Sequence, residues 1–437
     1  MFPYADKPED YWTGYFTSRQ GAKWQVREGQ AALHSAGWLY SLRVLDQNAT
    51  DGQISSVIGA RDALLDSMGI YQHHDAVTGT AKQYVADDYT LRHVKALNAN
   101  FDQYEKMINF LSHKMAGVQA NYWTHCVVTN GTYLDCPVSY HTNQTFIVAV
   151  QNPSMQAVYY QRIKLPHTKF SVQAWNPTLK NFTTVNSSAI CHLNTFENGL
   201  SINDCDLWVD NKVDAKTLSW LLVTYDPFKP EPTGGIKKFE YLTENTRGSL
   251  FKLYADDGSE KYMSFQLRYY EADAGGDNYT GSDNVPSGAY IFKPAKNKQF
   301  SMQYTSLVKQ ESFTANFVQQ TNLYFNDPDT NRSARAIVRA FAKNPALEFE
   351  VNLDPIPASQ GGQEVTANFF AYNLDNNDTF YTDSSAMEMQ KRILNFRPTW
   401  NLTTNEPVSS NYYPINQAIV IQDEDQNLAF VVTNDRS

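Results

Sequence analysis

At 437 residues, the chain is long enough to bury large cores and to form two or three domains. Hydrophobic residues make up 42% of the sequence and charged residues 19%, which is a globular balance and excludes a largely disordered chain. The formal net charge of −10 argues against a nucleic-acid partner, and no apolar run approaches the length of a membrane span. We therefore expect a folded multidomain protein with neither of these partners.

The first part of the chain predicts an antiparallel three-helix bundle over residues 21–117. Residues 1–20 are aromatic and turn-like, and three patterns of apolar residues spaced by three and four positions follow. The short polar connections between them favour antiparallel neighbours. The residues expected to share a face are Leu33, Ala36, Gly37, Tyr40 and Val44 in the first pattern, Ile54, Val57, Ile58, Leu65 and Met68 in the second, and Leu91, Val94, Leu97, Phe101, Tyr104, Ile108 and Leu111 in the third.

From about residue 120 the apolar period changes to two, which indicates β-strands. The clearest strand is "ALEFEVNLD", with Leu347, Phe349, Val351 and Leu353 on one face. Other segments with strand character are "TFIVAVQNP", "SWLLVTYDP", "KYMSFQLRYYEA", "GAYIFKP" and "LAFVVTND".

Many strands without intervening helices predict β-sandwich domains. The turn-rich "KPEPTGG" at 229–235 would separate a small sandwich (118–230) from a larger one (231–437). The expected fold class is therefore α+β multidomain, with an antiparallel three-helix bundle followed by all-β sandwich domains.

Glycosylation sequons and cysteines point to the secretory pathway. Cys126 and Cys136 flank one turn-rich stretch and Cys191 and Cys205 flank another, so both pairs look like short disulfide loops. Four cysteines allow three pairings, and four free buried thiols are the alternative. The start, "MFPYADKPED", is not a signal peptide, which predicts that the chain is an internal piece of a longer precursor. The nine Asn-x-Ser/Thr sequons are at Asn48, Asn130, Asn143, Asn181, Asn186, Asn278, Asn331, Asn377 and Asn401.

The stretch "YQHHDAVTGTAKQYVADD" (71–88) carries a possible metal site in His73, His74 and Asp75. Histidine and aspartate are common ligands of divalent metals, but adjacent residues on a helix do not face each other. The other seven histidines form no His-x-Asp, His-x-His or HExxH motif. The spacing alone therefore also fits a hydrogen-bonded loop histidine pair, with Thr78 or Thr80 capping the helix that follows.

Two long motifs in the same order resemble glycoside hydrolase family 38, the α-mannosidases, and more narrowly their lysosomal branch. They are "FPYADKPEDYWTGYFTSR" (2–19) and "YQHHDAVTGTAKQYVADDY" (71–89). Shorter matches follow in "GDN…SGAYIFKP", "TFYTDSSAMEMQKR", "RPTWNLTTNEPVSSNYYPIN" and "DRS". The resemblance implies that residues 1–20 are the tail end of a catalytic α/β domain. It also implies that 231–437 is a galactose-mutarotase-like sandwich that is incomplete at its C-terminus.

The resemblance further implies a role for four residues. His74 would bind a catalytic Zn²⁺, and Asp75 would hold hydroxyls of a bound mannose. Trp12 would line the aromatic pocket, and Tyr290 would reach a sugar hydroxyl. The alternatives are that Trp12 is ordinary core packing and that Tyr290 is an ordinary strand tyrosine. Asp6 could approach the same cleft or only cap a turn.

The sequence departs from the family where the remaining catalytic groups are expected. The family's His-x-Asp ligands and its aspartate nucleophile, in a "HIDPFGHS"-like stretch, do not occur in these residues. Retaining hydrolysis needs two carboxylates about 5 Å apart, and none is assigned here. The chain therefore resembles the middle of an enzyme acting on mannose-containing oligosaccharides. It would depend on an N-terminal catalytic domain and be inactive alone.

Two further expectations follow from this resemblance. A non-catalytic carbohydrate-binding or structural remnant is the alternative to a piece of an enzyme. The sequons and the acidic pI, about 5.4, fit a lysosomal, vacuolar or secreted protein.

Overall fold

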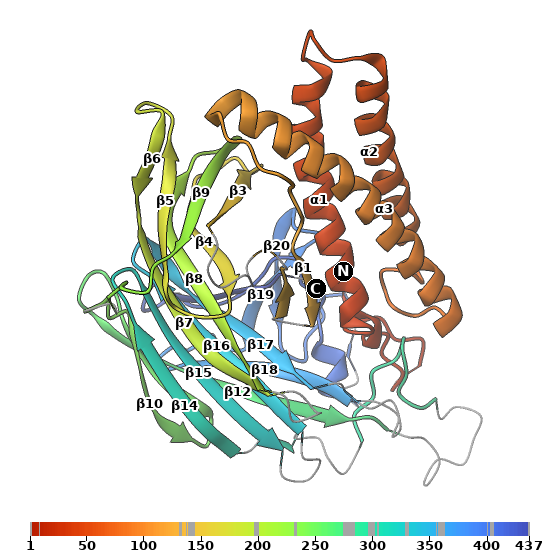
Figure 1. Cartoon of the computed structure of the whole chain (residues 1–437). Helices are drawn as coiled ribbons and strands as arrows, with labels where there is room; N and C mark the ends of the chain where they lie inside the picture. The colour runs from red at the N-terminus through yellow and green to blue at the C-terminus, as the bar shows by residue number, and fades with distance from the viewer. Residues whose placement is uncertain are drawn as a thin grey trace.

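The protein consists of a helical bundle beside several antiparallel sheets (Figure 1). This fold class confirms the expectation from the sequence. No described helix combines the length and the apolar composition that a membrane crossing requires. The computed structural model describes residues 2–435 except 8, 131–132, 137, 139–144, 196–200, 231–233, 274–284, 296–301, 304–305, 328–331, 355, 357–362, 400 and 403–405.

Three long helices form the bundle: α1 (Gln20–Val44), α2 (Asp51–Tyr71) and α3 (Gln83–Leu111). Thr50 begins α2 with a capping box, because its hydroxyl accepts from Gln53 N while the Gln53 side chain accepts from Thr50 N. A short π-helical turn, η2 (Ser112–Ala116), ends the bundle. The predicted helices are thus present, and each packs on the other two.

The buried faces of the helices differ in part from the predicted ones. Leu39 and Leu64 are fully buried, whereas Val44, Leu65, Leu91 and Val94 are exposed. Between Leu91 and Val94 on α3, the side chain that is buried is that of the polar His93. Its ring nitrogens contact Ser67 Oγ at 2.8 Å and the Gln25 carbonyl at 3.1 Å. A buried polar group with partners costs little, and an apolar pattern cannot reveal it.

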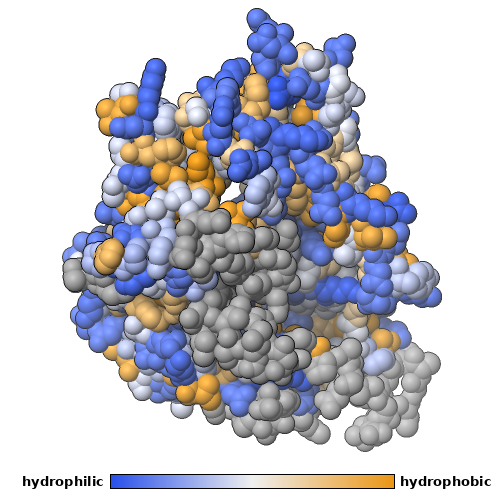
Figure 2. Space-filling model, viewed as in Figure 1, coloured by the Kyte–Doolittle hydropathy of each residue, from blue (hydrophilic) through white to orange (hydrophobic). Residues whose placement is uncertain are grey.

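Figure 2 shows how the polar and apolar residues are distributed over the visible surface. Hydrophilic residues cover much of the outer face of the helices, and hydrophobic residues lie between them in smaller groups.

The small sandwich packs two sheets face to face around Phe170, Leu207 and Leu221, all fully buried. Disulfides join Cys126 to Cys136 and Cys191 to Cys205, as the loop spacing suggested. One sheet has the order β3 (Phe146–Asn152), β9 (Thr217–Tyr225), β5 (Phe170–Asn176) and β6 (Asn181–Thr184), and the other has β4 (Val158–Leu165), β8 (Ser201–Val213) and β7 (Asn186–Thr195). A hairpin of β1 (Val127–Asn130) and β2 (Tyr133–Asp135) precedes them.

The larger β region begins with a sheet in which β10 (Phe239–Asn245), β11 (Gly248–Tyr254) and β12 (Glu260–Glu271) pair in order. Strands β13 (Met302–Gln303) and β18 (Gln363–Ala371) both pair with β12. The second sheet runs β14 (Ser306–Thr314), β15 (Val318–Asp327), β16 (Arg332–Phe341) and β17 (Asn344–Leu353), and the third runs β20 (Glu388–Ile393), β19 (Thr379–Ser384), β21 (Ala418–Asp423) and β22 (Leu428–Thr433).

Strand β17 confirms the predicted alternation, because Leu347, Phe349, Val351 and Leu353 all pack on the core between the sheets. The predicted strand at "GAYIFKP" is wrong. Residues 288–294 form a loop with one isolated bridge at Pro294. The predicted boundary at 229–235 lies partly outside the described residues, so the division at residue 230 stays a prediction.

A buried ionic cluster joins the small sandwich to the larger β region. Asp206 is fully buried and lies 2.7 Å from Arg162 and 2.9 Å from Lys164. Arg162 and Arg339 both reach Glu350 on β17, at 3.1 and 2.6 Å. Although burial opposes ionisation, these cations hold the pKa of Asp206 well below its usual range. The small sandwich and the larger β region are therefore held together by ion pairs that form only where the two regions meet.

Replacing Asp206 by asparagine should lower the free energy of unfolding by about 3 kcal/mol, because it removes the buried carboxylate that faces all three cations and leaves only Glu350 to balance them. Urea denaturation of the wild type and D206N measures this difference. Asp214→Asn is the matched control, since Asp214 forms an exposed pair with Lys212 and should change stability little. Equal effects of the two substitutions would contradict the role of the cluster.

Candidate functional site

Three segments that are distant in sequence converge at the candidate site. Trp12 precedes the short helix η1 (Gly14–Phe16), Asp75 lies in the loop between α2 and α3, and Tyr290 lies in the loop after β12. The Tyr290 hydroxyl donates a hydrogen bond to Asp75 Oδ1. The rings of Trp12 and Tyr290 are 5.3 Å apart. The structure thus brings together three of the residues that the resemblance singled out.

The loop from Gln72 to Lys82 is a series of turns. His73 and His74 stack with ring centroids 4.5 Å apart, and His73 Nδ1 accepts a hydrogen bond from the Asp75 amide at 3.1 Å. Side-by-side histidine rings are possible because the backbone here is not helical, contrary to the helical spacing considered from the sequence. His73 therefore shapes the loop that presents its neighbours.

Thr78 and Thr80 do not cap α3, so that expectation is wrong. Helix α3 begins at Gln83 with Lys82 as its N-cap and no side-chain cap. Instead, the Thr80 hydroxyl donates to Asp75 Oδ1 at 2.8 Å, and the Thr78 hydroxyl bonds the His74 carbonyl. Thr80 turns back into the loop because the Asp75 carboxylate is a charged, stronger acceptor, and Thr78 lies beside it with the two hydroxyls 2.9 Å apart.

The donor set fits a divalent metal in chemistry but is incomplete. Within the described ranges, His73, His74 and Asp75 are the group whose ligand atoms lie together, all within 4.8 Å. The His74 side chain is 84% exposed, and its Nε2 lies 3.6 Å from Asp75 Oδ2. Imidazole nitrogen and carboxylate oxygen suit Zn²⁺, which needs about three protein ligands at a catalytic site. Since His73 Nδ1 already accepts a hydrogen bond, a complete site needs donors from elsewhere.

Hydrogen bonding keeps Asp75 ionised. The bonds from the Tyr290 and Thr80 hydroxyls hold the pKa of the Asp75 carboxyl below its usual value. The same bond raises the pKa of the Tyr290 phenol, because the phenol already donates to a carboxylate. Asp75 is therefore a pure acceptor suited to hydroxyl groups of a ligand.

Asp6 holds the indole of Trp12. Its Oδ1 accepts from Trp12 Nε1 at 3.1 Å, and the Trp12 amide donates to the Tyr4 carbonyl at 2.8 Å. The Tyr4 ring stands edge-on to the indole at 5.9 Å. Asp6 thus approaches the site through Trp12, and both Tyr4 and Tyr290 remain partly exposed beside it.

The segment from Tyr11 to Arg19 supports both loops. On one side, the Gly14 amide donates to the Tyr290 carbonyl at 3.0 Å, and a Cβ at Gly14 would lie 2.9 Å from the Gly288 carbonyl oxygen. On the other side, Arg19 donates to carbonyls of the Asp75 loop. Sequence reasoning did not select Arg19, although the small residues of "VTGT" signal a close backbone approach.

Glu364 on β18 anchors the same segment from the β region. Both of its carboxyl oxygens lie within hydrogen-bond distance of the Thr17 hydroxyl, at 2.8 and 2.7 Å. Burial raises the pKa of Glu364 to about 7, and only the Thr17 hydrogen bond opposes that shift. The nearby phenol of Tyr412 is half-buried and its pKa is raised by desolvation, so it offers no counter-charge.

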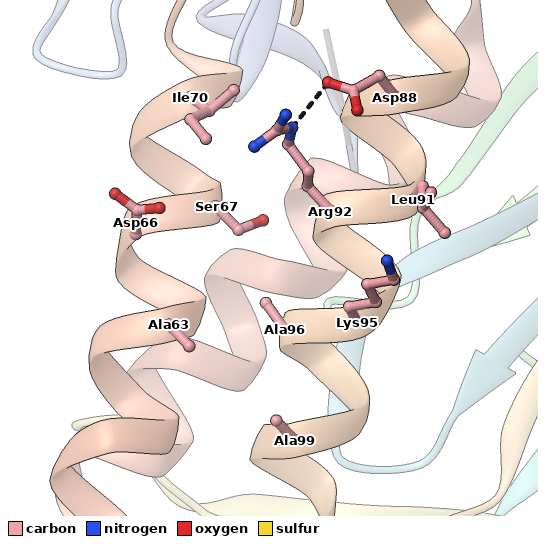
Figure 3. A pocket seen from close by; sticks show the side chains of 10 residues that line it. All are labelled: Ala63, Asp66, Ser67, Ile70, Asp88, Leu91, Arg92, Lys95, Ala96 and Ala99. Carbon is pink, nitrogen blue, oxygen red and sulfur yellow. Dashed lines mark hydrogen bonds and ion pairs between the residues drawn. The ribbon is translucent and has the colours of Figure 1, made fainter.

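A separate groove of about 460 Å³ lies between α2 and α3 (Figure 3). The charged residues at its rim include Asp88 and Arg92, which pair at 2.7 Å. Ser67 at its floor already bonds His93. None of the candidate site residues lines this groove.

Two family descriptions match the sequence. The "Alpha mannosidase middle domain" matches residues 10–111, and the "Glycosyl hydrolases family 38 C-terminal domain" matches residues 239–437. Together they cover both the bundle and the larger β region, so the helices and sheets have the fold of this family. The chain belongs to glycoside hydrolase family 38.

Similarity over the whole of this chain supports this membership. Among the most similar relatives are the lysosomal α-mannosidases of Felis catus and Bos taurus, 30% and 31% identical over the whole of this chain. The chain spans 42% and 41% of the length of these two relatives.

A solved α-mannosidase from Enterococcus faecalis has the same fold. It aligns over 95% of this chain and 49% of its own, with a TM-score of 0.55 at 11% identity.

The raised pKa of Glu364 predicts that stability falls as pH rises. Between about 4.5 and about 7 the unfolded carboxyl loses its proton while the folded one keeps it, so the unfolding free energy should drop across that window. The drop should be on the order of 3 kcal/mol. Thermal denaturation from pH 4 to 8 measures it.

Glu364→Gln should remove that part of the pH dependence, because glutamine does not titrate. The exposed Glu388→Gln serves as the control and should leave the profile unchanged. A profile of E364Q that parallels the wild type would show that Glu364 titrates normally.

Proposed function

We propose that this chain is the middle portion of a zinc-dependent, retaining α-mannosidase that hydrolyses terminal α-linked mannose from glycoprotein glycans. The observation that carries the proposal is the convergence of Trp12, Asp75 and Tyr290, of which the last two bond each other across 215 residues of sequence. Family membership and the similarity to lysosomal α-mannosidases support it.

Each residue has a chemical role in this proposal. Trp12 stacks on the apolar face of the terminal sugar and excludes water. The Asp75 carboxylate accepts hydrogen bonds from sugar hydroxyls, and the Tyr290 phenol orients the ring. His74 is one ligand of Zn²⁺, whose positive charge, when bound, would hold vicinal hydroxyls of a distorted sugar ring.

The remaining catalytic groups are proposed to belong to an N-terminal catalytic α/β domain. That domain would supply the nucleophile, the acid/base and the other zinc ligands, since no residue of this chain is assigned those roles. Because the relatives are more than twice as long as this chain, they have room for such a domain. The 437-residue chain by itself would then be inactive.

A non-catalytic carbohydrate-binding or structural role is the second candidate. The partly exposed rings of Tyr4 and Tyr290, both in contact with Trp12, favour it, because aromatic surfaces bind sugars without catalysing a reaction. Mannose binding that needs no zinc would distinguish this role from the first.

A lysosomal, vacuolar or secreted location fits the exposed sequons and the lysosomal relatives. Asn48, Asn181, Asn186, Asn377 and Asn401 are exposed and accessible to glycosylation. Asn143, Asn278 and Asn331 lie outside the described residues.

Hydrolysis of an aryl α-mannoside tests the proposed enzyme. The longer protein that carries this chain should release the aryl group, and the 437-residue chain should not, because it lacks a nucleophile. Robust turnover by the isolated chain, or none by the longer protein with bound zinc, would contradict the proposal.

Calorimetric titration with Zn²⁺ tests the assigned ligand. The isolated chain should bind zinc weakly, and His74→Ala should weaken that binding by about ten-fold or more, because it removes the exposed imidazole. His113→Ala, which removes an exposed imidazole on η2, is the matched control. Equal zinc binding by H74A and the wild type would remove His74 from the proposed site.

A further inference from the structure

Arg19 grips the loop that carries Asp75. Its Nη1 donates to the Gly79 carbonyl at 2.5 Å and to the Ala81 carbonyl at 2.7 Å, one on each side of Thr80. The two backbones also meet directly, because a Cβ at Gly79 would collide with the Ser18 carbonyl. Gly79 has a φ of +76°, which favours glycine in any case. The backbone around Thr80 is therefore held by one planar cation and by close contact.

Thr80 transmits this restraint to the Asp75 carboxylate. Its hydroxyl donates to Asp75 Oδ1 at 2.8 Å, and the Ala81 amide donates to the Asp75 carbonyl at 3.0 Å. Oδ1 also accepts from the Tyr290 hydroxyl, whereas Oδ2 faces the His74 imidazole at 3.6 Å. Two donors on a single oxygen determine the rotation of the carboxylate and direct its other oxygen towards His74.

The same N-terminal segment also bonds the loop that carries Tyr290. The Ser18 hydroxyl donates to the Ala289 carbonyl at 2.8 Å, and the Gly14 amide donates to the Tyr290 carbonyl at 3.0 Å. Ser18 and Arg19 are adjacent, so a single turn of backbone determines the distance between the Asp75 loop and the Tyr290 loop.

We propose that Arg19 and Thr80 are positioning residues that hold Asp75 in the orientation it needs for sugar hydroxyls. This inference rests on the proposed function. Arg19 acts through the backbone of residues 79–81, and Thr80 acts through its hydroxyl on Oδ1. Neither side chain touches the sugar.

The first test measures KM and kcat for an aryl α-mannoside in the longer protein, together with thermal unfolding. Thr80→Val keeps the shape of the side chain and removes the hydroxyl. It should raise KM roughly ten-fold, because a hydrogen bond to a charged group is lost, with little change in the unfolding temperature. Thr80→Ser should restore the wild-type KM. The control is Thr243→Val, at an exposed threonine of β10.

The second test needs no sugar. Hydrogen exchange of the 437-residue chain, read by mass spectrometry, should show faster exchange over residues 76–81 in Arg19→Lys, because lysine lacks the planar guanidinium whose Nη1 donates to both carbonyls while its Nη2 donates to Gln83 Oε1. Arg61→Lys, at the exposed Arg61–Asp62 pair on α2, should leave this exchange unchanged. Unchanged exchange in R19K would overturn the role of Arg19.

The outcomes separate this inference from the proposed function. If the longer protein turns over mannoside and T80V keeps the wild-type KM, or if T80S is as impaired as T80V, the positioning role of Thr80 is overturned while the enzyme assignment stands. If the longer protein with bound zinc does not turn over mannoside, the proposed function fails, and the roles of Arg19 and Thr80 in sugar recognition fail with it.

Discussion

The hydrogen bonds made by residues 14–19 are the constraint on which the candidate site depends. This segment lies between the helical bundle and the larger β region, and it bonds the loops of both. Glu364 fastens it to strand β18 through Thr17. Asp75 belongs to the helical bundle and Tyr290 to the larger β region. Their contact therefore depends on the position of residues 14–19 between the two. The site therefore needs the helical bundle, residues 14–19 and the larger β region together, and none of the three contains it alone.

Two carboxyl groups that are shielded from solvent are stabilised in different protonation states. Asp206 stays ionised because three cations surround it, and its charges join the two β regions. Glu364 has a hydroxyl but no described cation beside it, so it is held nearer to the neutral form. A neutral buried carboxyl suits acidic conditions, whereas a paired one tolerates a wide pH range. The support of the site should accordingly respond to pH through Glu364, whereas Asp206 at the contact between the β regions should stay ionised.

The sequence predicted the positions of helices and strands better than it predicted which of their faces are buried or which residues contact one another. Apolar periodicity located the three helices and most strands, because it reflects local geometry. It placed Leu91 and Val94 in the core incorrectly, since the adjacent His93 is buried through partners on α1 and α2. It also read residues 288–294 as a strand. Their backbone groups bond instead to Tyr11 and Gly14, about 280 positions earlier in the chain.

By itself, the sequence determined the fold class, the two close cysteine pairs and the motifs that selected Trp12, His74, Asp75 and Tyr290. These features depend on patterns of residues that are close together in the sequence, so they can be recognised without the structure. Only the tertiary structure decided that Asp75 and Tyr290 bond to each other and that Arg19 and Thr80 support them. The physical reason is that hydrogen bonds require partners at about 3 Å, and folding alone brings residues so far apart in the chain to that distance.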